Sequence, residues 1–94
     1  MPFSILLVED DTVLRGGLTE LFEREGYEVT AAVCVSDARA KYAPNIDLIV
    51  LDVTLPDGDG VSLCRAWRSE GVQQPMRRVV FKALENVLNV QAVE

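Results

Sequence analysis

An apolar segment that ends in an acid constrains the fold of this chain most. It runs from Ile46 to Leu51, with one aspartate inside it, and Asp52 follows directly. A run of this length bounded by a turn predicts a strand buried on both faces, as in a parallel α/β sheet. Ligands of such sheets bind beyond the carboxyl ends of the strands. We therefore expect Asp52 to be the working residue, with residues 53–60, rich in turn formers, as a loop beside it.

The same arrangement occurs near the amino terminus. The apolar segment from Ser4 to Val8 predicts a second buried strand, and the acids Glu9, Asp10 and Asp11 follow it. Asp11 is expected to cap the next helix, because its side chain can accept from the free N–H groups of the first turn. The sequence thus places acids at the carboxyl ends of two buried strands.

The rest of the chain alternates between predicted helices and strands. Further strands are predicted over residues 27–33 and 77–83, and helices over 12–25, 36–42, 60–70 and 84–94. This β-α-β-α-β-α-β-α order predicts an α/β fold with a parallel sheet and right-handed crossovers. We expect a flavodoxin-like, doubly wound sheet with the strand order 2-1-3-4, counted along the chain. Residues 1–94 are expected to form one domain.

That strand order brings Glu9, Asp10 and Asp52 together at one end of the sheet. Clustered carboxylates repel each other unless protons or a cation neutralise them. Mg²⁺ suits such a site, because it takes few protein carboxylates and keeps water or phosphate oxygens as other ligands. A carboxylate can also act as a nucleophile toward phosphorus and form an acyl phosphate. The simpler alternative is that these acids are helix caps or solvated loop residues.

Other kinds of site fit the sequence poorly. The chain has no histidine, which removes Ser–His and Cys–His catalysis and the commonest ligand of transition metals. Asp57 and Asp59 have the spacing of a calcium loop, but the glutamate that should end such a loop is missing. Cys34 and Cys64 lack CxxC spacing and are expected to be small core residues, with a disulfide as the minor alternative.

The charge of the chain limits its partners. A formal net charge of -6 argues against nonspecific binding to nucleic acid and to an anionic membrane surface. There is no apolar stretch of membrane-spanning length, and the first residues lack the basic region of a signal peptide. We therefore expect a cytoplasmic protein without direct contact with nucleic acid or membrane.

Three separated motifs resemble those of bacterial two-component response-regulator receiver domains, the CheY-like superfamily. They fall in the family's order and spacing, within a match over about residues 4–70, and comprise residues 5–11, 47–52 and 55–60. The resemblance implies that Asp52 is the phosphoacceptor, which receives a phosphoryl group from a sensor histidine kinase. It further implies a phosphorelay switch, for example for a transcriptional output, rather than a turnover enzyme.

The resemblance also assigns a metal site and a loop. Glu9, Asp10, Asp52 and the backbone carbonyl of Thr54 would hold Mg²⁺, and Gly60 would help to shape the loop beside the phosphoacceptor. Two alternatives remain open. One is a phosphorylation-silent interaction module that keeps the receiver fold. The other, which fits less well, is an aspartyl-phosphate hydrolase, because that group has a second aspartate where Thr54 stands.

The last quarter of the chain departs from the family. Receivers carry Thr or Ser at the end of their fourth strand, and Lys82 occupies the equivalent position here. Lys82 either replaces that hydroxyl in a truncated receiver or is the lysine that normally ends the fifth strand. The interval from Asp52 favours the first account, and in both accounts Lys82 could contact the phosphoryl group. A solvated lysine is the alternative.

Without a fifth strand or a last helix, the predicted fourth strand would be a bare sheet edge. Unpaired backbone groups on an apolar edge favour pairing with another chain. We therefore expect either a homodimer, formed through the C-terminal segment or the fourth-strand edge, or a tail that folds over this edge.

Overall fold

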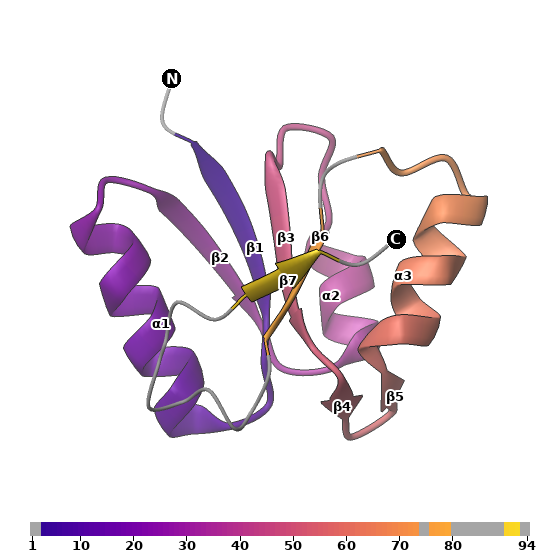
Figure 1. The fold of residues 1–94 in the computed structure, drawn as a ribbon, viewed down its shortest axis with the longest axis horizontal. Helices are drawn as coiled ribbons and strands as arrows, with labels where there is room; N and C mark the ends of the chain where they lie inside the picture. The colour runs from indigo at the N-terminus through magenta and orange to yellow at the C-terminus, as the bar shows by residue number, and fades with distance from the viewer. Residues whose placement is uncertain (1–2, 74–75, 80–89, 93–94) are drawn as a thin grey trace.

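The computed structural model describes residues 3–73, 76–79 and 90–92. Within these residues five strands form one sheet in the order β2-β1-β3-β6-β7 (Figure 1). The strands are β1 (Ser4–Val8), β2 (Glu28–Ala32), β3 (Leu48–Asp52), β6 (Met76–Val79) and β7 (Val90–Ala92). The helices are α1 (Thr12–Arg24), α2 (Val35–Lys41) and α3 (Gly60–Ser69). The strands β4 (Thr54–Leu55) and β5 (Gly58–Asp59) form a separate small hairpin.

The four major predicted strands have the predicted order. β1 pairs in parallel with β2 on one side and with β3 on the other, and β3 pairs in parallel with β6. β6 is the fourth of these strands along the chain, so the observed neighbours reproduce the expected 2-1-3-4 arrangement. The α/β, flavodoxin-like fold is confirmed.

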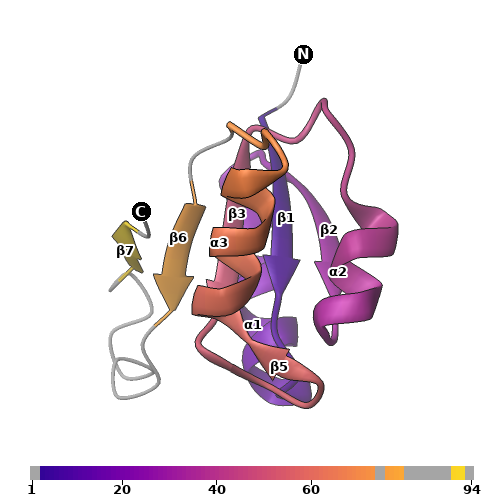
Figure 2. The ribbon, with the colours of Figure 1, turned by 90° about the vertical axis from the view of Figure 1, so that its right-hand side faces the viewer.

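Helices cover both faces of the sheet. α1 lies on one face, and α2 and α3 lie on the other (Figure 2). Alternate residues of β1 therefore enter two separate cores, since successive strand residues point to opposite faces. Ile5 and Leu7 pack with Leu14 and Leu18 of α1, whereas the intervening strand residues pack in the core that contains Trp67 of α3. Burial on both faces explains why the central strands are apolar runs.

The central strand starts later than predicted. The apolar run begins at Ile46, but β3 begins at Leu48 and includes Asp52. Asp47 forms two hydrogen bonds with Ser4 at the start of β1. Its N–H donates to the Ser4 carbonyl at 2.8 Å, and its Oδ2 accepts from the Ser4 N–H at 2.8 Å. This pair of hydrogen bonds accounts for the acid inside the apolar segment.

The start of α2 also differs from the prediction. The helix begins at Val35 and its N-cap is Cys34, whose Sγ accepts from the Asp37 N–H at 3.4 Å. Cys34 is half-buried, so its prediction as a core residue was wrong, because the thiol is used as a cap. Cys64 is fully buried in the core between the sheet and α3, as predicted.

The C-terminal segment corrects a further prediction. A helix was predicted over residues 84–94, but Val90–Ala92 is a strand that pairs antiparallel with β6. Residues 84–89, 93 and 94 lie outside the described residues, as do residues 80–83 of the predicted fourth strand, with Lys82. Pairing satisfies N–H and C=O groups that β6 would otherwise leave open. The tail therefore folds over the edge, which is one of the two outcomes expected.

None of the helices in the described part of the chain is long and apolar enough to cross a membrane.

Candidate functional site

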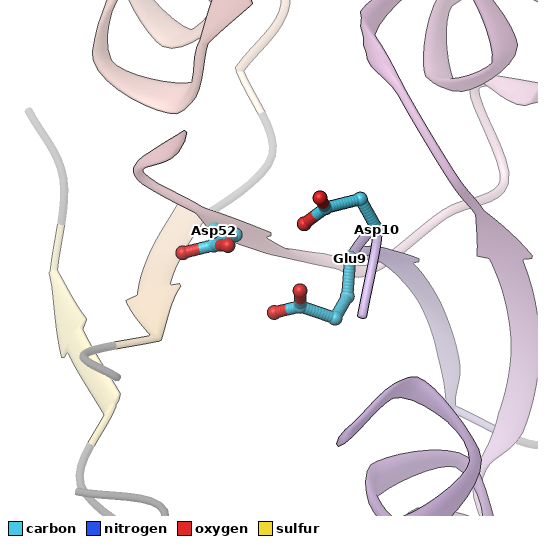
Figure 3. Close-up of side chains that lie close together, drawn as sticks. All are labelled: Glu9, Asp10 and Asp52. Carbon is cyan, nitrogen blue, oxygen red and sulfur yellow. The ribbon is translucent and has the colours of Figure 1, made fainter. Parts of the chain in front are cut away.

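The predicted carboxylate cluster is present. Glu9 and Asp10 follow β1, and Asp52 is the last residue of β3. Because β1 and β3 are parallel neighbours, with Val8 opposite Leu51, the acids meet at one end of the sheet. One carboxylate oxygen from each of the three lies within 4.8 Å of the other two. Figure 3 shows the side chains of Glu9 and Asp10 extending toward Asp52.

Two of these acids are buried with an oxygen left unpaired. Glu9 is 0% exposed and Asp52 is 2% exposed. Glu9 Oε2 accepts from the Asp11 N–H at 3.0 Å, and Asp52 Oδ1 accepts from the Val53 N–H at 2.7 Å. Glu9 Oε1 and Asp52 Oδ2 have no hydrogen-bond partner among the described residues. A buried, unsatisfied carboxylate oxygen is costly, so this arrangement calls for a proton or a cation.

Burial changes the proton affinity of both acids. Burial raises the pKa of Glu9 to about 8. The hydrogen bond from the Asp11 N–H acts in the opposite direction, and the charge of Asp52 adds a smaller increase. Burial also raises the pKa of Asp52, while the N–H groups of Val53 and Thr54 act in the opposite direction. Without a cation, the cluster therefore retains a proton near neutral pH.

The donor set fits a hard divalent cation. All three side chains offer carboxylate oxygens, which Mg²⁺ and Ca²⁺ prefer over nitrogen and sulfur. Two of those oxygens are buried and unsatisfied, which is the state that a bound cation relieves. Thr54 is exposed and begins β4, two residues beyond Asp52. A contact between its carbonyl and a metal stays a prediction, and Lys82 lies outside the described residues.

The two acids of the loop, Asp57 and Asp59, cap helices. Asp57 accepts from the N–H groups of Val35 and Ser36 at 2.7 and 3.0 Å, and so caps the first turn of α2 from the β4–β5 hairpin. Asp59 caps α3 by accepting from the Ser62 N–H at 2.7 Å. These hydrogen bonds lower the pKa of both carboxyls. The expectation that they do not form a calcium loop agrees with this use.

Gly60 joins α3 closely to the site. Its N–H donates to the Val53 carbonyl at 2.8 Å, and a Cβ placed on it would collide with the backbone carbonyl of Asp52. The start of α3 can therefore lie against the end of β3 only because the residue has no side chain. This contact gives a steric reason for a glycine at position 60, where the resemblance predicts a residue that shapes the loop beside Asp52.

Arg15 is a site residue that the sequence analysis missed. It lies in the first part of α1, and its Nη1 donates to the carbonyls of Glu9 and Asp10 at 3.0 and 3.2 Å. The signal in the sequence was a basic residue five to six positions after an acid pair, near the start of the predicted helix. Helical side chains lean toward the amino terminus of their helix, which is the direction of that pair.

The pKa of Glu9 predicts how stability depends on pH. We expect the metal-free protein to become less stable as the pH rises from about 4.5, the ordinary pKa of a glutamate, to about 8, the pKa of Glu9 in the folded protein. In that range the folded state holds a proton that the unfolded state has lost, so the free energy of unfolding falls, by on the order of a few kcal/mol at most. Urea denaturation at pH 5 and pH 8 in EDTA measures this difference.

Two controls accompany that measurement. Mg²⁺ should restore more stability at pH 8 than at pH 5, because it replaces the lost proton. The Glu9→Gln variant should show a flatter pH dependence, since its amide does not titrate. A metal-free wild-type protein that is equally stable at both pH values, or more stable at pH 8, would contradict the assignment.

Comparison with known proteins gives a consistent family. The family model described as a response regulator receiver domain matches residues 5–93. The chain is 40% identical over 74 residues to the swarming motility regulation protein RssB of Serratia marcescens, covering 78% of this chain and 34% of that protein. It thus spans about a third of the length of the curated relatives that it matches.

Solved structures are similar as well. The non-phosphorylated HemR receiver domain of Leptospira biflexa matches with a TM-score of 0.73 and 42% identity, over 81% of this chain and 61% of that chain. The response regulator TrrA of Thermotoga maritima, solved in complex with Mg²⁺ and BeF, matches with a TM-score of 0.75 and 25% identity, over 90% and 76% of the two chains.

Proposed function

The chain belongs to the response regulator receiver family, a family of phosphorelay signal transduction, and on that premise we propose that Asp52 is its phosphoacceptor. Receiver domains of response regulators accept a phosphoryl group from histidine kinases, and a sensor histidine kinase is the donor proposed here. One observation carries the assignment: Asp52 is a buried acid at the end of a central strand with one oxygen unsatisfied.

We propose that Glu9, Asp10 and Asp52 hold Mg²⁺ together with the backbone carbonyl of Thr54. The unsatisfied oxygens of Glu9 and Asp52 support a cation, and the choice of Mg²⁺ follows from an all-oxygen site with few protein ligands. When bound, the ion neutralises phosphoryl oxygens and the repulsion among the acids.

The residues themselves account for the reacting geometry. The Val53 N–H donates to Asp52 Oδ1 at 2.7 Å and so restricts rotation of the carboxylate, one oxygen of which is the proposed nucleophile. In transfer, this oxygen forms a bond to phosphorus while the phosphorus–nitrogen bond of the donor phosphohistidine breaks. The product is an acyl phosphate on Asp52 and a free imidazole on the donor.

We propose a switch rather than a turnover enzyme. Hydrolysis of an acyl phosphate by a second carboxylate would need an acid two residues after Asp52, and Thr54 stands there, exposed at the start of β4. A phosphorylation-silent module is the rival function. Lys82, where the family has Thr or Ser, is the feature of the sequence that favours it.

Acetyl phosphate separates these functions, because it supplies a phosphoryl group without a kinase. The protein is incubated with acetyl phosphate and MgCl₂, or with acetyl phosphate and EDTA, and its intact mass is measured. A phosphoacceptor gives one phosphoryl adduct that requires Mg²⁺. The absence of an adduct at every Mg²⁺ concentration would support the silent module and overturn the proposal.

Self-association is part of the proposal and has its own test. The sheet ends in β7, a strand of three residues, so among the described strands β7 rather than β6 forms the outer edge. Although β7 covers the edge of β6, it presents its own outer edge, and we therefore propose a homodimer through the C-terminal segment or this edge. Size-exclusion chromatography with light scattering should give twice the mass of the chain, and a clean monomer would contradict it. We also propose that this domain makes no direct contact with nucleic acid, which the net charge of -6 favours, and that the protein is cytoplasmic.

A further inference from the structure

We propose that Arg15 is a positioning residue for the metal site, because its guanidinium fixes the backbone that carries Glu9 and Asp10. Nη1 of Arg15 lies 3.0 Å from the Glu9 carbonyl oxygen and 3.2 Å from that of Asp10. Two consecutive carbonyls that accept from one group set the planes of two consecutive peptides. They thereby set the directions in which both carboxylates leave the chain. This inference rests on the proposed function.

Two further hydrogen bonds hold Glu9 within the described part of the chain. Its N–H donates to the Ala32 carbonyl of β2 at 2.9 Å, and its Oε2 accepts from the Asp11 N–H at 3.0 Å. The bond from Arg15 supplies the contact to the carbonyl. With Arg15 in place, the polar atom of Glu9 without a partner in the described residues is Oε1 of the carboxylate, and Figure 3 shows this side chain extending toward Asp52.

The position of Arg15 in α1 makes this contact natural. The helix is capped by Asp11, and the Arg15 N–H donates to the Asp11 carbonyl at 2.8 Å, so the residue lies one turn above the loop. Its side chain leans back toward that loop. Hydrogen bonds from a charged donor are about twice as strong as neutral ones. The bond to the Glu9 carbonyl is partly buried, whereas the bond to the Asp10 carbonyl is exposed.

The charge of Arg15 and its positioning of the ligands have opposite effects on metal binding. A positive charge near the cluster repels a cation, so removing it would strengthen Mg²⁺ binding if charge were its only contribution. Removing a group that holds the ligands in place would weaken binding. The sign of the change therefore distinguishes a positioning residue from a nearby charge.

The test compares Mg²⁺ affinities of four proteins by isothermal titration calorimetry. They are the wild type, Arg15→Ala, Arg15→Lys and Arg24→Ala. Arg24 is the matched control: it is an arginine of the same helix, and its side chain is exposed and paired with Glu20 at 2.8 Å, at the opposite end of α1. Urea denaturation in EDTA reports the fold of each variant separately.

We expect Arg15→Ala to weaken Mg²⁺ binding by about tenfold, the lower end of the range for groups that orient metal ligands. Arg15→Lys should fall between this variant and the wild type, since it keeps the charge but lacks the planar guanidinium. Arg24→Ala should bind as the wild type does. If Arg15→Ala does not fold, Arg15→Lys carries the test, with weaker binding expected.

Two results would overturn the inference, and they are distinguishable. Unchanged or tighter Mg²⁺ binding in folded Arg15 variants, with normal binding by the wild type, would refute the positioning role and leave the proposed function intact. No Mg²⁺ binding by the wild-type protein would refute the metal site itself, and the role of Arg15 with it.

Discussion

Replacement of Gly60 with alanine is expected to lower the free energy of unfolding by about 3 kcal/mol or more. The added Cβ would collide with the backbone carbonyl of Asp52 and approach Leu51 Cδ1 to 3.2 Å. A backbone group at the end of a central strand cannot turn aside as a flexible side chain can. Either α3 or the end of β3 must move, and the second movement would displace Asp52. Urea denaturation measures the loss of stability.

Gly16→Ala is the matched control for this prediction. Gly16 lies inside α1, and a Cβ there would meet no heavy atom within 4 Å. Alanine has the higher helix propensity, so this variant should be more stable than the wild type by roughly 0.5–1 kcal/mol. A Gly60→Ala protein as stable as the wild type would show that the contact between α3 and β3 is not tight.

Asp52→Asn is expected to abolish the phosphoryl adduct completely. An amide has nearly the shape of the carboxylate but does not form an acyl phosphate, so the fold should be kept and the reaction lost. Removing one of three clustered charges should also stabilise the metal-free protein at pH 8, by about 1–2 kcal/mol, since burial and repulsion disfavour the charged form. Intact mass after treatment with acetyl phosphate and Mg²⁺ measures the first effect, and urea denaturation in EDTA the second.

Asp57→Asn serves as the control for Asp52→Asn. Asp57 is a loop acid a few residues further on, but its carboxylate caps α2 and stands outside the cluster. This variant should therefore still be phosphorylated. An adduct that persists in Asp52→Asn, or that disappears in Asp57→Asn while the protein stays folded, would contradict the assignment of Asp52.

The carboxylate cluster was predictable because it depends on few facts. Apolar runs identify the buried strands, and the acids that follow them must meet once β1 and β3 are neighbours in a parallel sheet. The cap of α1 by Asp11 was predictable for a similar reason, since it is a local contact within one helical turn, and it is observed at 2.9 Å.

What the sequence did not predict depends on contacts between distant segments. The use of Asp57 as a cap for α2 joins residues more than twenty positions apart and requires the β4–β5 hairpin to lie beside that helix. The residues of β7 were included in a predicted helix because Leu84, Val87 and Leu88 have helical spacing in the sequence, whereas the open edge of β6 is a property of the whole sheet. Arg15 was missed because its role depends on the direction of one side chain.

The most direct test of the central claim, that Asp52 is the phosphoacceptor, locates the phosphoryl group chemically. Borohydride reduces an acyl phosphate to an alcohol, releasing phosphate and converting the modified aspartate to homoserine. The protein is phosphorylated with acetyl phosphate and Mg²⁺, reduced, digested and sequenced by tandem mass spectrometry. We predict homoserine in place of Asp52 and at no other aspartate. Conversion of Asp10 or Asp57, or none in a protein that carries the adduct, would contradict the claim.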